Sequence, residues 1–386
     1  MVQNTAKLGG TASTVTVAKV AVSTSPQPLR DLPIDTIYIC MYGVARPHDD
    51  DVRILAPTPC RDLHATGVIH RWRGRSSPAP DEECFEAIKA GIDALPPGVK
   101  MFLNSGEFYG PEFSTGNLEL VARFFDKYPE YVDRTFISVK GGLKARALEP
   151  DSSPENLRRS VDTINAALRG TKRLDLFQCA RVDKKVPIEE TIKVLAEFIK
   201  EGKLDHIGMS ECSAATLRRA HAVHPITAVE IEVSPWSYEE ETKKVIATAG
   251  ELGISVIAYS PLGRGFLTGT IKSLDDLTEN DARRRFTRFA EENFKQNLVF
   301  VDAIKALAEK KQITPAQLCI AWVGSLGAHV IPLPGSSHKT RTLENLAGGD
   351  VELTETDRAE ILNIISTYEV KGDRYFGNPQ AAHLWG

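Results

Sequence analysis

The sequence has few cysteines, no long apolar run and no excess of charge of one sign. Six single cysteines, with no C-x-x-C pair, suit neither a disulfide framework nor a structural zinc site. The longest apolar stretch, Ile34 to Ala45, contains Asp35 and is shorter than the roughly 18 residues a membrane-spanning helix needs. Lys and Arg total 47 against 51 for Asp and Glu, so the basic excess expected of a nucleic-acid or membrane binder is missing. These absences favour a cytoplasmic small-molecule enzyme without metal, membrane or nucleic-acid partners; they leave its oligomeric state open.

The N-terminal 65 residues differ in composition and hydrophobic pattern from the rest of the chain. They are rich in Ser, Thr, Pro and Asp, with two short strand-like runs, Val15 to Val22 and Thr36 to Tyr42. The first 30 residues contain no acid, which leaves open an organelle-targeting segment or a disordered tail. We expect residues 1–65 to be a poorly ordered extension and residues 66–386 to form one domain.

From Thr66 onward, short apolar runs alternate with amphipathic segments, a pattern typical of repeated βα units. The expected strands are Val68–Arg71, Met101–Leu103, Phe136–Val139, Leu174–Cys179, His206–Met209, Ala228–Val233, Ser255–Tyr259 and Val330–Pro332. The expected helices are Asp81–Ala94, Thr115–Tyr128, Pro154–Leu168, Ile188–Glu201, Ala214–Ala222, Glu239–Leu252, Lys295–Lys311 and Arg341–Leu346. Eight strands with eight helices predict an α/β fold of the (β/α)8 TIM-barrel type, with a doubly wound open sheet as the alternative.

Two segments lie outside this repeat. Leu262–Asn293 is a long charged insertion, and Glu352–Gly386 is a tail whose start, Glu355–Tyr368, has helical spacing. On a barrel, such segments lie over the face that carries the active site.

The strand ends offer one physically sensible proton donor. Tyr109 follows the second expected strand and Lys140 ends the third. An isolated phenol has a pKa of about 10, and a neighbouring ammonium lowers it by stabilising the phenolate. Taken singly, Tyr109 is equally well explained as a packed loop residue and Lys140 as a solvated cation.

Several motifs occur together and resolve this ambiguity. They are Asn104 to Gly110, Lys140, Gly208-Met-Ser210, Ala258-Tyr-Ser-Pro-Leu-Gly-Arg-Gly265, and Ile331-Pro-Leu-Pro-Gly-Ser-Ser337 followed by Arg341, Glu344 and Asn345. Over Thr66 to Tyr368 the chain resembles the aldo-keto reductases. Leu174 to Asp183 is most similar to the fungal pyridoxal reductase branch of that family.

The resemblance implies an NADPH-dependent reduction of a carbonyl, with Tyr109 as proton donor and Lys140 as the residue that tunes it. Ser210 and Glu230 match positions that hold the nicotinamide carboxamide, and Tyr259 matches the ring that stacks on the nicotinamide. Ser336 and Arg341 match groups that bind the 2′-phosphate, which suits the planar fork of an arginine. The positions matched to cofactor binding are Ser210, Glu230, Tyr259, Ser260, Leu262, Gly335, Ser336, Arg341, Glu344 and Asn345.

Three positions depart from the family pattern. Asn104 replaces the usual aspartate, Ala180 the usual histidine, and Gly335 a frequent lysine. Because Asn104 carries no charge, we expect an unpaired Lys140 ammonium that acts strongly on Tyr109. Arg181 is expected to replace the histidine donor or contact substrate, although strand alternation also permits it to point away.

Trp72 is a candidate substrate-pocket residue, with core packing as the alternative. The favoured function is reduction of pyridoxal to pyridoxine, in vitamin B6 metabolism. The alternatives are reduction of another aldehyde or ketone, and a cofactor-binding regulatory subunit with little catalysis. Gly263-Arg-Gly265 is no dinucleotide fingerprint, because Thr268 stands where its third glycine belongs.

Overall fold

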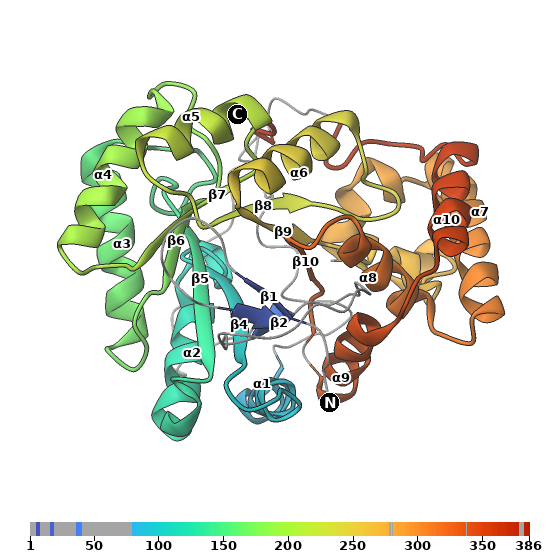
Figure 1. Ribbon diagram of the computed structural model, residues 1–386, viewed down its shortest axis with the longest axis horizontal. Helices are drawn as coiled ribbons and strands as arrows, with labels where there is room; N and C mark the ends of the chain where they lie inside the picture. The colour runs from blue at the N-terminus through green and yellow to red at the C-terminus, as the bar shows by residue number, and fades with distance from the viewer. Residues whose placement is uncertain are drawn as a thin grey trace, which may run out of the picture.

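The structure, a computed structural model, describes residues 79–277, 279, 281–336, 338–377 and 382–386, together with three strands nearer the N-terminus. Its centre is a curled parallel sheet with helices along its outer side (Figure 1). Seven parallel strands follow one another in chain order: β4 (Lys100–Gly106), β5 (Thr135–Gly141), β6 (Leu176–Cys179), β7 (His206–Ser210), β8 (Ala228–Glu232), β9 (Ser255–Tyr259) and β10 (Val330–Leu333). They confirm seven of the expected strands; Val68–Arg71 lies outside the described residues.

The strand order decides the fold class. Each strand from β4 to β10 pairs with the next one along the chain, without a point at which the order reverses. A doubly wound sheet has such a reversal, whereas a TIM barrel does not. The prediction of a TIM barrel is therefore confirmed, and the doubly wound alternative is wrong.

Three short strands precede this series. β3 (Thr36–Cys40) pairs in parallel with β4 and also contacts β10, so it lies where a first barrel strand belongs. β1 (Thr5–Lys7) and β2 (Thr16–Ala18) form an antiparallel pair, and β2 meets β4 through Val17 and Lys100. The run at Thr36, which we expected to belong to a poorly ordered extension, thus adds a strand to the sheet. The expected domain boundary at residue 66 lies outside the described residues.

Most expected helices begin and end within two residues of their expected bounds, but the one expected at Lys295–Lys311 begins four residues earlier, at Glu291. They are α1 (Asp81–Asp93), α2 (Gly116–Lys127), α3 (Pro154–Leu168), α4 (Ile188–Lys200), α5 (Ala214–Val223), α6 (Glu240–Leu252), α7 (Glu291–Lys310), α8 (Pro315–Ser325), α9 (Lys339–Ala347) and α10 (Glu355–Thr367). Ser153 caps α3 by accepting from Asn156 N–H, with Pro154 in the first turn. Gly253 ends α6 with φ 68°, a left-handed conformation that favours glycine.

One helix, α8, was missed by the sequence analysis. Thr314 and Gln317 form a capping box around Pro315, which is a recognisable start signal. From Ala316 to Gly324 its side chains are almost all buried, because the helix packs between its neighbours. A helix buried on every side lacks the amphipathic spacing by which the other helices were identified.

Two hydrophobic cores explain which strand residues face the barrel interior. A small cluster inside the barrel contains Phe102, Phe136, Leu176, Ala228 and Ile257, whereas their sequence neighbours pack outward against the helices. Because strand side chains alternate between the two faces, residues two or four positions further along also face inward. The inward positions above the apolar layer are polar: Asn104, Lys140, Gln178, Ser210, Glu230, Glu232 and Tyr259.

The chain after α10 returns to the barrel. We call residues 368–377 and 382–386 the C-terminal tail. Ser213, just after β7, donates its N–H to the carbonyl oxygen of Gly386 at 3.1 Å, and Thr287 donates to that of Tyr375 at 3.1 Å. The insertion after β9 consists mainly of short 3-10 turns until α7 begins at Glu291. In the described part of the chain, the helices fall short of the length and apolar character needed to traverse a bilayer.

Candidate active site

Four polar side chains, those of Lys140, Glu230, Asn104 and Gln178, form a hydrogen-bonded network inside the barrel. Lys140 on β5 is ion-paired with Glu230 on β8 and donates to Asn104 Oδ1 at 3.1 Å. Asn104 Nδ2 donates to Glu230 Oε2 at 2.7 Å, and Gln178 Nε2 donates to the same oxygen at 2.6 Å. Lys140, Asn104 and Glu230 are 5%, 2% and 1% exposed. Three of these residues were predicted to belong to the site; Gln178 was given no role.

This network overturns one expectation. Lys140 is not an unpaired ammonium, because the Glu230 carboxylate contacts it directly. The expectation considered only position 104, where the family carries an acid. It overlooked that β8 presents Glu230 to the same interior, two residues beyond Ala228 of the apolar layer.

Tyr109 can lie beside this network because the residue beneath its ring, Gly106, has no side chain. A Cβ at Gly106 would lie 2.9 Å from Tyr109 Cδ1 and 3.0 Å from its Cγ, so only glycine permits the ring this close. Gly106 is also the β4 residue in register with Lys140. As a result, Lys140 Nζ lies 5.7 Å from the centre of the Tyr109 ring. The structure thus brings together the predicted acid and the predicted tuning cation.

The position of the replaced histidine is apolar. Ala180 is buried with Phe108 and Leu143, and Tyr109 packs against this cluster. Arg181 does not turn toward Tyr109: its guanidinium donates to the carbonyl oxygens of Ala180 and Ala382 and to the Tyr375 hydroxyl. Arg181 therefore attaches the C-terminal tail to the barrel. Trp72, the other candidate substrate contact, lies outside the described residues.

The next strand ends fit the nicotinamide end of a cofactor. Ser210 Oγ is buried without a hydrogen-bond partner among the described residues, and such an atom is costly unless a ligand satisfies it. Ser210 is in register with Glu230, and Glu232 with Tyr259. Ser260, directly after Tyr259, has φ 53°, a strained backbone of the kind that clusters at functional sites. The residues present therefore fit the carboxamide and ring predicted for this place.

A second group of predicted cofactor residues lies around the start of α9. Ser336 is buried and its hydroxyl donates to the carbonyl oxygen of His338 at 2.9 Å, while Thr342 donates to Ser336. Arg341 is exposed in the first turn of α9, and Gly335 is exposed just before it. Asn345 is buried one turn further along, beside the half-buried Glu344. An exposed arginine at a helix N-terminus is a suitable arrangement for a phosphate.

A buried charge cluster, which we define as Glu211, Glu232, Arg264 and Arg374, borders the Tyr259 hydroxyl. Arg374 of the tail donates to Glu211 at 2.7 Å and to Glu232 at 3.1 Å. Arg264 donates to both oxygens of Glu232 at 3.1 and 3.2 Å. Burial works to raise the pKa of Glu232, but the cations Arg264 and Arg374 outweigh it and hold the pKa at about 2. The sequence assigned these four residues no role.

Tyr259 joins this cluster through its hydroxyl. It donates to Glu211 at 2.6 Å and shares a 2.9 Å hydrogen bond with the Tyr375 hydroxyl. Burial, together with the charge of Glu211, raises the pKa of Tyr259 well above its usual value. Tyr259 therefore stays a neutral phenol. The tail contacts it through its hydroxyl group, by way of Arg374 and Tyr375.

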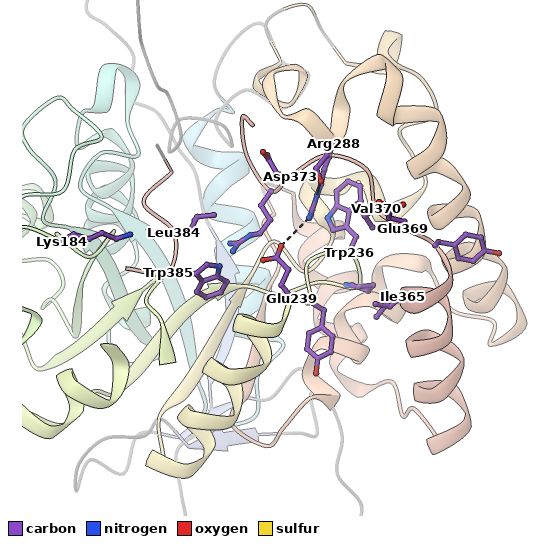
Figure 2. A pocket seen from close by; sticks show the side chains of 15 residues that line it. Lys184, Trp236, Glu239, Arg288, Ile365, Glu369, Val370, Asp373, Leu384 and Trp385 are labelled. Carbon is purple, nitrogen blue, oxygen red and sulfur yellow. Dashed lines mark hydrogen bonds and ion pairs between the residues drawn. The ribbon is translucent and has the colours of Figure 1, made fainter. Parts of the chain in front are cut away.

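A pocket of about 630 Å³ lies between the tail, α10 and the loop after β8 (Figure 2). Its walls include Trp236, Arg288, Tyr368, Arg374 and Trp385. Figure 2 shows Arg288 turned toward Glu239, with which it pairs at 3.9 Å. None of the predicted site residues lines this pocket, so it is distinct from the Tyr109 and Lys140 site.

Comparisons with known proteins agree with this geometry. The family model described as the aldo/keto reductase family matches residues 70–366. This chain belongs to the aldo-keto reductase family. It is 37% identical to probable pyridoxal reductase 2 of Schizosaccharomyces pombe over 309 residues, covering 79% of this chain and 91% of that protein. It is also 37% identical to the aldo-keto reductase str7 of Strobilurus tenacellus over 298 residues, covering 76% and 84%.

Two solved structures share the fold. The glycerol dehydrogenase of Gluconobacter oxydans matches with a TM-score of 0.64 at 24% identity, covering 81% of this chain and 91% of its own. A putative 2,5-diketo-D-gluconic acid reductase B matches with a TM-score of 0.56 at 20% identity, covering 74% and 84%. At these identities the likeness concerns the barrel alone. The chain is thus an oxidoreductase of a family that acts on small carbonyl compounds.

Proposed function

We propose that this aldo-keto reductase uses NADPH to reduce an aldehyde to a primary alcohol, and that pyridoxal, which becomes pyridoxine, is its substrate. The observation that carries the proposal is the placement of Tyr109 over Gly106, beside the buried Lys140. The likeness to probable pyridoxal reductase 2 supports the choice of pyridoxal. On this proposal the protein acts in vitamin B6 metabolism, in the cytoplasm. The described cysteines are free thiols, which suits a reducing compartment.

NADPH, when bound, supplies a hydride for the carbonyl carbon. Tyr109 donates its hydroxyl proton to the carbonyl oxygen, and this proton together with the hydride would convert the aldehyde to an alcohol. Lys140 stabilises the phenolate left on Tyr109, because its ammonium lies beside the ring. Removing water from this pair strengthens the interaction, since charges attract more strongly in a low-dielectric interior.

Other side chains hold the cofactor in place. Ser210 Oγ would hold the nicotinamide carboxamide and thereby gain the partner it lacks within the described chain. The face of Tyr259 supports the nicotinamide ring. Arg341 and Ser336 bind the 2′-phosphate at the start of α9, which favours NADPH over NADH.

The loss of NADPH absorbance on adding pyridoxal tests the proposal directly. Turnover by the wild-type chain, abolished in Tyr109→Phe while NADPH binding is unchanged, is the expected result. Wild-type turnover by Tyr109→Phe would show that another residue is the acid. Faster turnover of other aldehydes or ketones in a side-by-side panel would support the alternative substrate class.

A second candidate function follows from Ala180. Ala180 has no side-chain donor for a carbonyl oxygen, and its described neighbours Phe108 and Leu143 supply none; losing such a donor costs on the order of 10²- to 10³-fold in rate. This observation favours a cofactor-binding subunit with little catalysis. Tight NADPH binding without turnover of any carbonyl in the panel would establish that function instead.

A further inference from the structure

Lys140, the cation proposed to tune Tyr109, has its counter-charge on a different strand from the one where the family places it. We propose that Glu230 on β8 is a positioning residue that holds Lys140 charged and oriented, and that it replaces the aspartate that is Asn104 here. This inference rests on the proposed function. It assigns to Glu230 a role other than contact with the nicotinamide carboxamide.

Burial makes a counter-charge necessary. Lys140 is 5% exposed and Glu230 1% exposed, and an ammonium that far from water is costly unless it is paired and hydrogen-bonded. Among the described residues, Glu230 is the carboxylate that contacts Lys140. Asn104 contributes an amide oxygen at 3.1 Å, which solvates the ammonium without neutralising it.

The hydrogen bonds show that Asn104 and Glu230 form a matched set. Asn104 must direct its oxygen at Lys140, because an amide NH₂ and an ammonium are both donors. Its nitrogen is then directed at Glu230 Oε2, 2.7 Å away. An aspartate at position 104 would place two carboxylates within hydrogen-bond distance, and such a pair does not ionise fully. A glutamate at 230 therefore requires an amide at 104.

Gln178 completes the set from β6. Its amide nitrogen donates to Glu230 Oε2 at 2.6 Å and to Ser138 Oγ at 3.1 Å. The Glu230 carboxylate is consequently bonded to Lys140, Asn104 and Gln178 at once, and these bonds fix its orientation. A carboxylate fixed in this way holds Lys140 in one place relative to the Tyr109 ring, 5.7 Å from its centre.

The decisive experiment exchanges the carboxylate of Glu230 and the amide of Asn104. Glu230→Gln removes the charge, Asn104→Asp adds one, and the double variant Asn104→Asp with Glu230→Gln moves the carboxylate from β8 to β4. Glu201→Gln, which removes an exposed carboxylate paired with Arg158 at the end of α4, is the control. Each variant is assayed for kcat and KM with NADPH and pyridoxal across pH, and for thermal midpoint without cofactor.

We expect Glu230→Gln to lower kcat roughly 10²-fold with little change in KM for NADPH, a loss within the range of general acid–base catalysis. Removing the carboxylate favours proton loss from both Lys140 and Tyr109, so the alkaline limb of the kcat profile moves to lower pH. The double variant should regain most of kcat and the original pH profile. Glu201→Gln should behave as wild type.

The cofactor-free measurements separate this inference from the proposed function. Glu230→Gln should lower the thermal midpoint, and adding Asn104→Asp should restore it, whether or not any carbonyl is turned over. If wild type reduces no carbonyl yet this rescue is seen, the proposed function fails and the pairing stands. If Glu230→Gln keeps the wild-type kcat profile and midpoint, or the double variant is no better than Glu230→Gln, the positioning role of Glu230 is refuted.

Discussion

Arg374 and Glu211 form a buried ion pair, with 2.7 Å between Arg374 Nη2 and Glu211 Oε1, although 163 residues separate them in the chain. Arg374 also donates to Glu232 and to the Tyr259 hydroxyl. One tail arginine therefore bridges the ends of β7, β8 and β9. The C-terminal tail is part of the wall of the site rather than an appendage.

Arg374→Met should accordingly loosen the tail. The substitution leaves Glu211 and Glu232 buried with one cation fewer, and breaking a buried ion pair from one side costs about 3 kcal/mol or more. Urea unfolding followed by circular dichroism measures the loss. Arg219→Met, which removes an exposed pair with Glu189, is the control and should leave the curve nearly unchanged. Equal curves for the two variants would mean that the Arg374 contacts add no stability.

The same cluster predicts how stability depends on pH. Against the effect of burial, Arg264 and Arg374 hold the pKa of Glu232 at about 2, below its ordinary value of 4.5. The unfolded chain therefore takes up a proton at higher pH than the folded one, and the stabilising effect is present above pH 4.5 and lost as pH falls toward 2. Thermal midpoints should therefore fall as the pH is lowered from 4.5 toward 2. The Glu232→Gln variant should show a shallower fall; an unchanged slope would assign the acid sensitivity to other carboxylates.

Gly106→Ala should displace Tyr109 without touching the cofactor residues. Its new Cβ would lie 2.9 Å from Tyr109 Cδ1, so the ring must leave its present place beside Lys140. Displacement of a catalytic group by about 1 Å costs on the order of 10²-fold in kcat. In the Tyr109→Phe background the same change should cost little more, because the proton donor is already gone. A further large loss there would show that Gly106 serves another purpose.

The fold was largely predictable because its signals are local. Strand alternation, the Ser153 cap and Gly253 at the end of α6 each depend on a few neighbouring residues, and all appear at the expected places. β6 begins at Leu176, two residues later than expected. The buried α8 shows the limit of the method, because periodicity disappears when every face of a helix is covered.

Residues of the candidate site could be predicted only where they lie at the ends of expected strands. Tyr109, Lys140 and Asn104 were found in this way and lie together in the structure. The counter-charge was missed because Glu230 lies 90 residues from Lys140, and nothing local to either residue identifies the partner. The inward alternation of β8 was the available signal. For Arg374, whose partners lie on three strand ends, no comparable signal exists in the sequence.

Cofactor choice is tested at Arg341, which is exposed in the first turn of α9. Its side chain makes no hydrogen bond or ion pair within the described chain, so replacing it disturbs little of the fold. A guanidinium bonded to a phosphate contributes about 1.5–3 kcal/mol, equivalent to roughly 10- to 100-fold in Kd. Arg341→Ala should therefore weaken NADPH binding by that factor in a fluorescence titration. NADH, which lacks the 2′-phosphate, is the matched control ligand and should bind both proteins alike. If the binding of NADPH and of NADH weakens equally, Arg341 does not recognise the 2′-phosphate. If the binding of neither nucleotide weakens, the phosphate is held by other residues.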